Sequence, residues 1–319
     1  MKFILTSDWH LVHENPVCRK DNLFDTQFAK LGEMFNYAVN NKIKYILQAG
    51  DMFDKPRDWY VLDRLIRFLA NCLEKGIQVF CVRGQHDMYF RNTKESVTNS
   101  TLLEQLGLIT VLVGKENFAT VVTDYKDRIR HDIHIYGASY GEDVPIPKTS
   151  GRENDINILV IHKEISNHLA YEMADFTKAK EFLDKHNKFD LILCGDIHQY
   201  FCETTMYKGR AICNTGPLLR KEATEDMIAH KPCFMVYDSI DRKITNIQLT
   251  VAPAKEVISD THLEMKHMKE EVMEKFKDGL SSSFKGVSFT DILEKYLKDN
   301  NIDPIVCGII SAYMERSNQ

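Results

Sequence analysis

The chain has 319 residues, 44% hydrophobic and 27% charged, which is the composition of a globular protein with one large domain and room for a small one. The formal net charge of −5 excludes any argument for nucleic-acid binding from overall charge, so a basic surface must be local. No apolar run approaches the roughly 18 residues of a membrane span, and the first residues do not resemble a signal peptide. Since none of the eight cysteines forms a Cys-x-x-Cys pair, we expect reduced thiols and a cytoplasmic protein that does not bind membranes.

Strands and helices alternate through the first hundred residues. Short apolar runs predict strands at 3–5, 45–47 and 77–82, and apolar residues at helical spacing predict helices over 28–39 and 62–73. Gly76 follows the second helix, as a C-terminal glycine should. This alternation predicts βαβ units and therefore a parallel sheet.

Beyond residue 108 the pattern changes to short strands joined by tight turns. Runs at 112–114, 119–122 and 133–137 predict a second, partly antiparallel sheet. A helix is expected near 177–186, between strands at 158–162 and 191–194. The predicted closing strands cover residues 211–213, 234–237 and 244–249.

The composition shifts near Pro253, and this shift divides the chain. Residues 1–250 are predicted to form the main domain, and residues 251–283 a reduced cap or linker that contains a charged helix and a serine-rich stretch. Residues 284–319 carry two apolar stripes at helical spacing, which predict a C-terminal pair of helices.

Five predicted strands end in side chains that could bind metal. These side chains are Asp8, His10, Asp51, Gln85, His162, Asp196 and His198. Any one of them, taken alone, is more often a turn, a cap or an interior histidine. Strands of an open sheet present ligands from their carboxyl ends, so five such ends together predict one site. Asp51 is the candidate carboxylate shared between two divalent cations, a pair that acidifies a bridging water and clamps phosphate oxygens.

His86 is the candidate catalytic group beside this site. It could protonate a leaving oxygen or stabilise charge on a phosphate, and Asp54 could hold its other ring nitrogen. Asp87 is interpreted as a capping carboxylate. The basic residues near these motifs are either a solvated surface or a track for a phosphate backbone. The candidates for that track are Lys55, Arg57, Arg83 and Arg91.

Three motifs resemble those of calcineurin-like metallophosphoesterases. They are Ser7-Asp8-Trp9-His10-Leu11, Ala49-Gly50-Asp51-Met52-Phe53-Asp54 and Gly84-Gln85-His86-Asp87. The segment from Ser96 to Leu108 is similar to the SbcD-type DNA repair and recombination nuclease subunits, bacteriophage members included, and Asn214-Thr215-Gly216-Pro217 resembles a late motif of the family. The likeness covers about residues 1–220 and weakens beyond 250.

The resemblance implies an α/β fold, a four-layer α/β-β-α sandwich with a C-terminal helical segment. It also implies a DNA exonuclease and endonuclease that uses two Mn²⁺ ions, with Mg²⁺ possible, and acts on double-stranded DNA and its ends. By position, Asp8, His10, Asp51 and His198 would hold one metal, and Asp51, Gln85, His162 and Asp196 the other. Two of these depart from the pattern, which has Asn at Gln85 and His at Asp196.

The expected function is that of the catalytic subunit of an SbcCD-like complex in a bacterial or phage-infected cytoplasm. The resemblance implies a homodimer and an SbcC-type coiled-coil ATPase that binds residues 284–319. A general metallophosphatase, a cyclic-nucleotide phosphodiesterase and a non-catalytic scaffold are the alternatives. His86, as a leaving-group acid, argues against a non-catalytic scaffold. The C-terminal helical pair argues against a free-standing phosphatase.

Overall fold

A computed structural model describes residues 1–89, 97–112, 120–126, 129–147, 155–167, 176–206, 209–259, 273, 296–300 and 306. The chain divides into two compact units, Met1–Ser259 and Asp260–Gln319. The fold below is that of the first unit. The predicted linker, the C-terminal helical pair and Arg91 fall almost wholly outside the described residues, so the predicted boundaries at 250 and 284 stay predictions.

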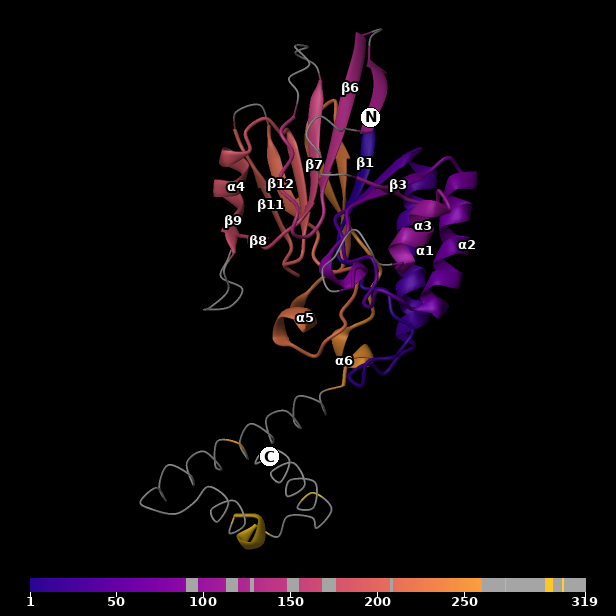
Figure 1. The fold of residues 1–319 in the computed structure, drawn as a ribbon, viewed down its shortest axis with the longest axis vertical. Coiled ribbons are helices and arrows are strands. Elements are labelled where there is room, and N and C mark those ends of the chain that lie inside the picture. The colour runs from indigo at the N-terminus through magenta and orange to yellow at the C-terminus, as the bar shows by residue number, and fades with distance from the viewer. Residues whose placement is uncertain are drawn as a thin grey trace. The chain divides into compact units, whose positions relative to one another are not determined.

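Two six-stranded sheets form the centre of this unit (Figure 1). The first has the order β14-β13-β1-β2-β3-β4, and β1 to β4 run parallel. Its strands are β1 (Lys2–Thr6), β2 (Tyr45–Gln48), β3 (Gln78–Cys81), β4 (Thr110–Val111), β13 (Cys233–Asp238) and β14 (Lys243–Gln248). The second has the order β11-β12-β10-β7-β6-β5, with antiparallel strands only at its edges. Its strands are β5 (Thr120–Lys126), β6 (Ile129–Ala138), β7 (Ile156–His162), β10 (Leu191–Gly195), β11 (Phe201–Thr204) and β12 (Ala211–Asn214).

Helices cover the outer faces of both sheets. The first sheet carries α1 (Leu23–Asn40), α2 (Trp59–Glu74) and α3 (Asn99–Gln105), and the second carries α4 (Ala179–Lys185). The remaining elements are η1 (Gln85–Asp87), α5 (Glu225–Ala229), α6 (Ala254–Val257) and the paired short strands β8 (Ile165–Ser166) and β9 (Thr177–Lys178). Polar side chains begin the long helices, because Asn22 and Asp58 each accept a backbone N–H of the first turn.

The alternation of side chains along the central strands produces the layers. On β1, Phe3 and Leu5 face the other sheet, whereas Ile4 faces the helices. On β7, Ile158 and Val160 complete the core between the sheets, and Leu159 packs toward α4. Three cores therefore separate four layers, and the predicted α/β-β-α sandwich is confirmed.

Most predicted elements are confirmed, the short elements α3, α5, α6, β8 and β9 were not predicted, and two strands of the large sheets differ from the prediction. The short strand expected near residue 112 is β4, and it joins the first sheet beside β3, because α3 forms a crossover that returns the chain parallel. The edge strand β11 was not predicted, since Phe201–Thr204 has no apolar run. The partly antiparallel second sheet is confirmed by the pairing of β5 with β6.

The seven cysteines among the described residues are free thiols, as predicted, and six of them are buried. No helix in the described part of the chain is long and apolar enough to cross a bilayer.

Lys30 on α1 gives a test of the packing. Its side chain is buried and its ammonium donates to the Thr250 carbonyl at 2.8 Å, and burial lowers its pKa from 10.5 to about 8. Between pH 8 and 10.5 the unfolded chain therefore binds more protons than the folded one, so the free energy of unfolding should rise with pH. The rise is roughly 3 kcal/mol for a shift of this size.

We expect Lys30→Met to remove that rise and to leave the chain folded. Urea unfolding at pH 7.5 and 10 gives the change in the free energy of unfolding with pH for the wild type and for Lys30→Met. Subtracting one change from the other cancels the contribution of all other titrating groups. The same pH slope in the two proteins would contradict the assignment.

Candidate metal centre

The seven predicted ligands meet at one edge, where parallel strands of both sheets end. Asp8 and His10 follow β1, Asp51 follows β2, and Gln85 follows β3 in the first sheet. His162 ends β7, and Asp196 and His198 follow β10 in the second sheet. The sandwich thus brings together residues up to 190 positions apart in the chain.

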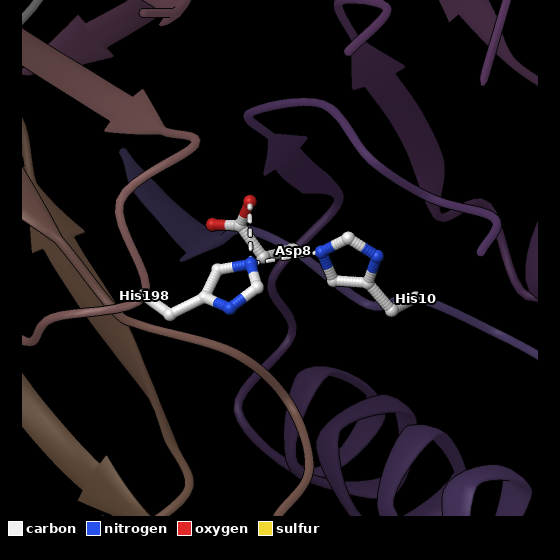
Figure 2. A group of neighbouring side chains, drawn as sticks. All are labelled: Asp8, His10 and His198. Atoms are coloured by element: carbon white, nitrogen blue, oxygen red, sulfur yellow. Dashed lines mark hydrogen bonds and ion pairs between the residues drawn. The ribbon is translucent and has the colours of Figure 1, made fainter. Parts of the chain in front are cut away.

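Asp8, His10 and His198 form the first cluster (Figure 2). The Nε2 atoms of the two histidines lie 2.9 Å apart, and His198 Nε2 lies 3.9 Å from Asp8 Oδ1. Asp8 is fully buried, and its Oδ1 accepts the backbone N–H of Asp196 at 3.0 Å. Three candidate metal-ligand atoms, from loops of both sheets, therefore face a common point.

Asp8, Asp51 and His162 form the second cluster, which Asp196 and Gln85 extend. His162 Nε2 lies 3.4 Å from Asp51 Oδ2 and 3.9 Å from Asp196 Oδ1. The Gln85 amide donates to Asp196 Oδ1 at 2.8 Å. The two residues that depart from the family pattern are thus in direct contact.

Unpartnered buried atoms test whether these residues suit a metal. Six of the seven residues have a buried side-chain atom without a hydrogen-bond partner. The atoms are Asp8 Oδ2, His10 Nδ1, Asp51 Oδ2, Gln85 Oε1, His162 Nε2 and Asp196 Oδ2. Each such atom costs about 1–3 kcal/mol unless something binds it. Carboxylate, amide and imidazole donors fit divalent cations such as Mn²⁺, so the residues fit the predicted ions.

The backbone at the site adopts an unusual conformation. Six non-glycine residues in the described part of the chain have a positive φ, and four of them are Asp8, His10, Asp51 and Asp196. A left-handed conformation at such residues costs about 1–3 kcal/mol each and persists only where the surroundings enforce it. Hydrogen bonds between the loops do so, since Asp8 N donates to Gly50 O at 3.1 Å and His10 N to Asp51 O at 3.0 Å.

Three glycines allow the loops to approach this closely. A Cβ atom on Gly84 would lie 2.0 Å from Asp51 Oδ1, and one on Gly50 would lie 2.3 Å from His162 Nδ1. A Cβ atom on Gly195 would lie 2.3 Å from the carbonyl oxygen of Ala49. Any larger residue at these positions would displace a candidate ligand or its support.

A hydrogen bond to the backbone fixes the orientation of the His162 ring. Its Nδ1 donates to the Ala49 carbonyl at 2.7 Å, which leaves Nε2 as the ligand atom. Burial opposes a charge on this ring, but the neighbouring Asp51 outweighs burial and raises the pKa of His162. Burial also opposes the Asp51 charge, and His162 outweighs it and lowers the pKa of Asp51. The Asp51 carboxylate therefore stays ionised and available to a cation.

His86 lies beside both clusters. Its backbone N–H donates to Asp51 Oδ1 at 2.9 Å, and its ring packs edge-on against that of His10. Its Nδ1 donates to Asp54 at 2.8 Å, as predicted, but the acceptor is the backbone carbonyl of Asp54. The Asp54 carboxylate turns toward His10 instead, with Oδ1 3.7 Å from Nδ1. Asp54 therefore positions two histidines with two different groups.

Lys221, which pairs with the Asp54 carboxylate, was not predicted as a site residue. Burial would raise the pKa of that carboxyl, but His10 and Lys221 hold it well below its usual range. No signal marks Lys221 in the sequence, because lysines are frequent and this one follows no strand. The contact depends on a loop that only the fold brings to the site.

Asp87 is a cap, as interpreted from the sequence, but it caps two loops. Its carboxylate accepts backbone N–H groups from Gly84 at 2.9 Å, Phe53 at 3.0 Å and Met52 at 3.3 Å. This buried side chain thus binds the loop after β2 to the loop after β3.

The late motif, residues 214–217, packs against the loop that follows β1. Ser7 Oγ is 2.9 Å from Thr215 Oγ1 and donates to Asn214 Oδ1 at 3.1 Å. The Asn214 amide donates in turn to the carbonyl of Ile197, between Asp196 and His198, at 2.7 Å. The motif therefore supports candidate ligands of both sheets through hydrogen bonds to their loops.

The predicted basic track is engaged in contacts within the protein. Lys55 pairs with Glu14, Arg57 donates to the Val97 carbonyl, and Arg83 pairs with Glu104. Arg91 lies outside the described residues. DNA binding by these residues stays a prediction.

Comparisons with known proteins give a family and a set of distant structural relatives. A sequence family described as calcineurin-like phosphoesterase matches residues 1–200. No curated protein sequence matches the chain. A dimetal phosphatase structure from Danio rerio is 11% identical with a TM-score of 0.47, covering 78% of this chain and 96% of its own. Two Vps29 structures from Entamoeba histolytica, a single mutant and the wild type with Zn²⁺, are 9% identical with TM-scores of 0.33. They cover 78% of this chain and 100% and 98% of their own.

Gly84→Ala should disrupt the centre by sterics alone, because the φ of Gly84 suits any residue while the added Cβ would meet Asp51. We expect a loss of about 1–3 kcal/mol in the free energy of unfolding, the usual range for overpacking. Because Asp51 must move, Mn²⁺ affinity should fall about tenfold or more, as measured by isothermal titration calorimetry.

Gly32→Ala is the matched control, since a Cβ there meets nothing within 4 Å and Gly32 lies within α1. It should bind Mn²⁺ normally and be slightly more stable. Equal Mn²⁺ affinity in the two variants would show that Asp51 does not bind the ion.

Proposed function

The chain belongs to the calcineurin-like phosphoesterase family, and from this premise we propose that it is a metal-dependent DNA nuclease. In this proposal it is the catalytic subunit of an SbcCD-like recombination and repair complex. The observation that carries the hydrolytic chemistry is the set of unpartnered buried ligand atoms with His86 beside it. The motif resemblance supports the choice of DNA as substrate.

Two Mn²⁺ ions, or Mg²⁺ in their place, are the proposed cofactors. Asp8, His10, Asp51 and His198 would hold one ion, and Asp51, Gln85, His162 and Asp196 the other. Asp51 Oδ2 lies 3.6 Å from His10 Nε2 and 3.4 Å from His162 Nε2, which supports Asp51 as the shared ligand, and Asp8 also belongs to both clusters. When bound, such a pair supplies Lewis-acid polarisation of the phosphate and acidifies water.

The protein's own groups bind and orient the scissile phosphate. A cavity of about 110 Å³ is lined by His10, His86, His198 and Lys221, among others, which is room for a phosphate group but not for a nucleotide. The Asp54 carbonyl accepts the Nδ1 proton of His86, so Nε2 is the nitrogen left for the substrate, and in the doubly protonated ring its proton can pass to the leaving oxygen or stabilise the phosphate.

His86→Ala should retain metal binding and lose activity on the order of 10²-fold or more, the usual scale for a general acid. The measurements are Mn²⁺ titration calorimetry and digestion of a labelled DNA duplex in Mn²⁺. His186→Ala, at the end of α4 and away from the site, is the control and should behave as the wild type.

Loss of metal binding in His86→Ala would make His86 a ligand, and normal digestion would remove it from the mechanism. A phosphate monoester and a cyclic nucleotide tested in parallel separate the nuclease from a general phosphatase or a cyclic-nucleotide phosphodiesterase. A wild type that hydrolyses only those small substrates would contradict the nuclease, and one that hydrolyses nothing would indicate a scaffold.

We also propose a homodimer and a coiled-coil ATPase partner. Exposed apolar side chains on and beside α2 and α3 support the dimer: Trp59, Tyr60, Val97 and Leu106 are 64, 69, 55 and 59% exposed. The apolar stripes of residues 284–319 support the partner, because an amphipathic helix can bury such a stripe in a groove.

Deleting residues 284–319 should abolish co-purification with a co-expressed ATPase and leave Mn²⁺ binding intact. Replacing Ile305 and Ile309 with Asp tests the same surface in the full chain, and the matched change of Lys298 and Asn301 to Asp should have no effect. Unchanged co-purification of both disrupted proteins would contradict the proposal.

A further inference from the structure

A second and larger cavity adjoins the metal centre. Its volume is about 440 Å³, four times that of the phosphate-sized cavity. His198, which is a candidate ligand and is 41% exposed, lines both cavities. A group bonded to a phosphate at the metal centre can therefore extend past His198 into the larger space.

The lining of this cavity has the chemistry of a site for a nucleobase. Tyr200, two residues after His198, is 44% exposed, and its hydroxyl forms a hydrogen bond with the Asn246 side chain. Asn246 and Gln248 lie on one face of β14 because they are two residues apart on a strand. Their amides both donate and accept, which matches the edge of any base. Lys231 and Asp226 contribute one charge of each sign, so the lining does not favour a second phosphate.

The loop that carries Tyr200 is held in place. Gln199 accepts the Ser166 hydroxyl at 2.9 Å, and its backbone N–H donates to the Ile197 carbonyl at 2.8 Å. His230 is fixed by the hydrogen bond of its Nε2 to the Pro217 carbonyl at 2.7 Å. A pre-positioned aromatic ring gains stacking energy at little cost in conformational entropy.

We propose that this cavity binds the base of one unpaired nucleotide adjacent to the scissile phosphate, with Tyr200 as its stacking platform. The proposal rests on the proposed nuclease function and names its substrate form. A base within a duplex has both faces covered by its neighbours, so only an unstacked base can lie on Tyr200. The enzyme therefore acts on single strands or frayed ends, and Tyr200 sets substrate affinity without taking part in the chemistry.

The test uses a single-stranded oligothymidylate with one natural phosphodiester among hydrolysis-resistant phosphorothioates, so that a single bond is cut. Two further strands lack the base on the 5′ or the 3′ side of that bond. Stacking on an aromatic side chain is lost at a scale of about tenfold. We expect Tyr200→Ala to raise KM for the complete strand about tenfold with kcat changed far less, and Tyr200→Trp to restore it.

The abasic strands show whether Tyr200 and the base act together. One of them should show the same tenfold rise in KM with the wild type, and no further rise with Tyr200→Ala. Met206→Ala, a fully exposed residue beyond β11, is the control and should match the wild type. Equal KM values for Tyr200→Ala and the wild type would overturn the base site. So would a rise in KM on removal of the base that is as large in Tyr200→Ala as in the wild type. Neither outcome would contradict the nuclease function. A wild type that binds Mn²⁺ but cuts no strand would overturn the nuclease and this site with it.

Discussion

The structure depends on the burial of charged ligands where two sheets meet. Asp8 and Asp51 are almost completely inaccessible, and each has an oxygen without a hydrogen-bond partner. Burying an ionised carboxylate is unfavourable unless an opposite charge accompanies it. The fold therefore holds in place an arrangement that a bound divalent cation would stabilise, and the energy for this comes from the three apolar cores around it.

Hydrogen bonds connect the loops that hold these candidate ligands to one another. Asp87 binds the second loop to the third, Ser7 binds the first loop to the late motif, and Asn214 binds that motif to the loop after β10. Left-handed backbone at four ligands and glycines at the closest contacts are consequences of this crowding. A rigid site of this kind can keep its geometry when a substrate replaces water.

Two cavities of different size meet at His198, and their chemistry differs. The smaller has histidines and Lys221 for a phosphate, and the larger has an exposed ring and amides. Lys221 lines the smaller cavity and also pairs with Asp54, whose carboxylate lies near His10. The surroundings of His198 thus combine the candidate metal centre with the cavity that we propose binds the group attached to the phosphate.

The sequence by itself determined the strand-then-ligand pattern and the identity of the seven clustered residues, whereas the layers were implied by the family resemblance. It could do so because each ligand follows a short apolar strand, and parallel strands of one sheet end at the same edge. It also indicated a partner for His86 three residues beyond Asp51, although the acceptor is a carbonyl and not the carboxylate. Only the tertiary structure decided that β4 joins the first sheet, that Lys221 reaches Asp54 and that Gln85 contacts Asp196. These contacts join residues between 30 and 167 positions apart through loops and edges, where no periodic pattern of apolar residues marks which surfaces will meet.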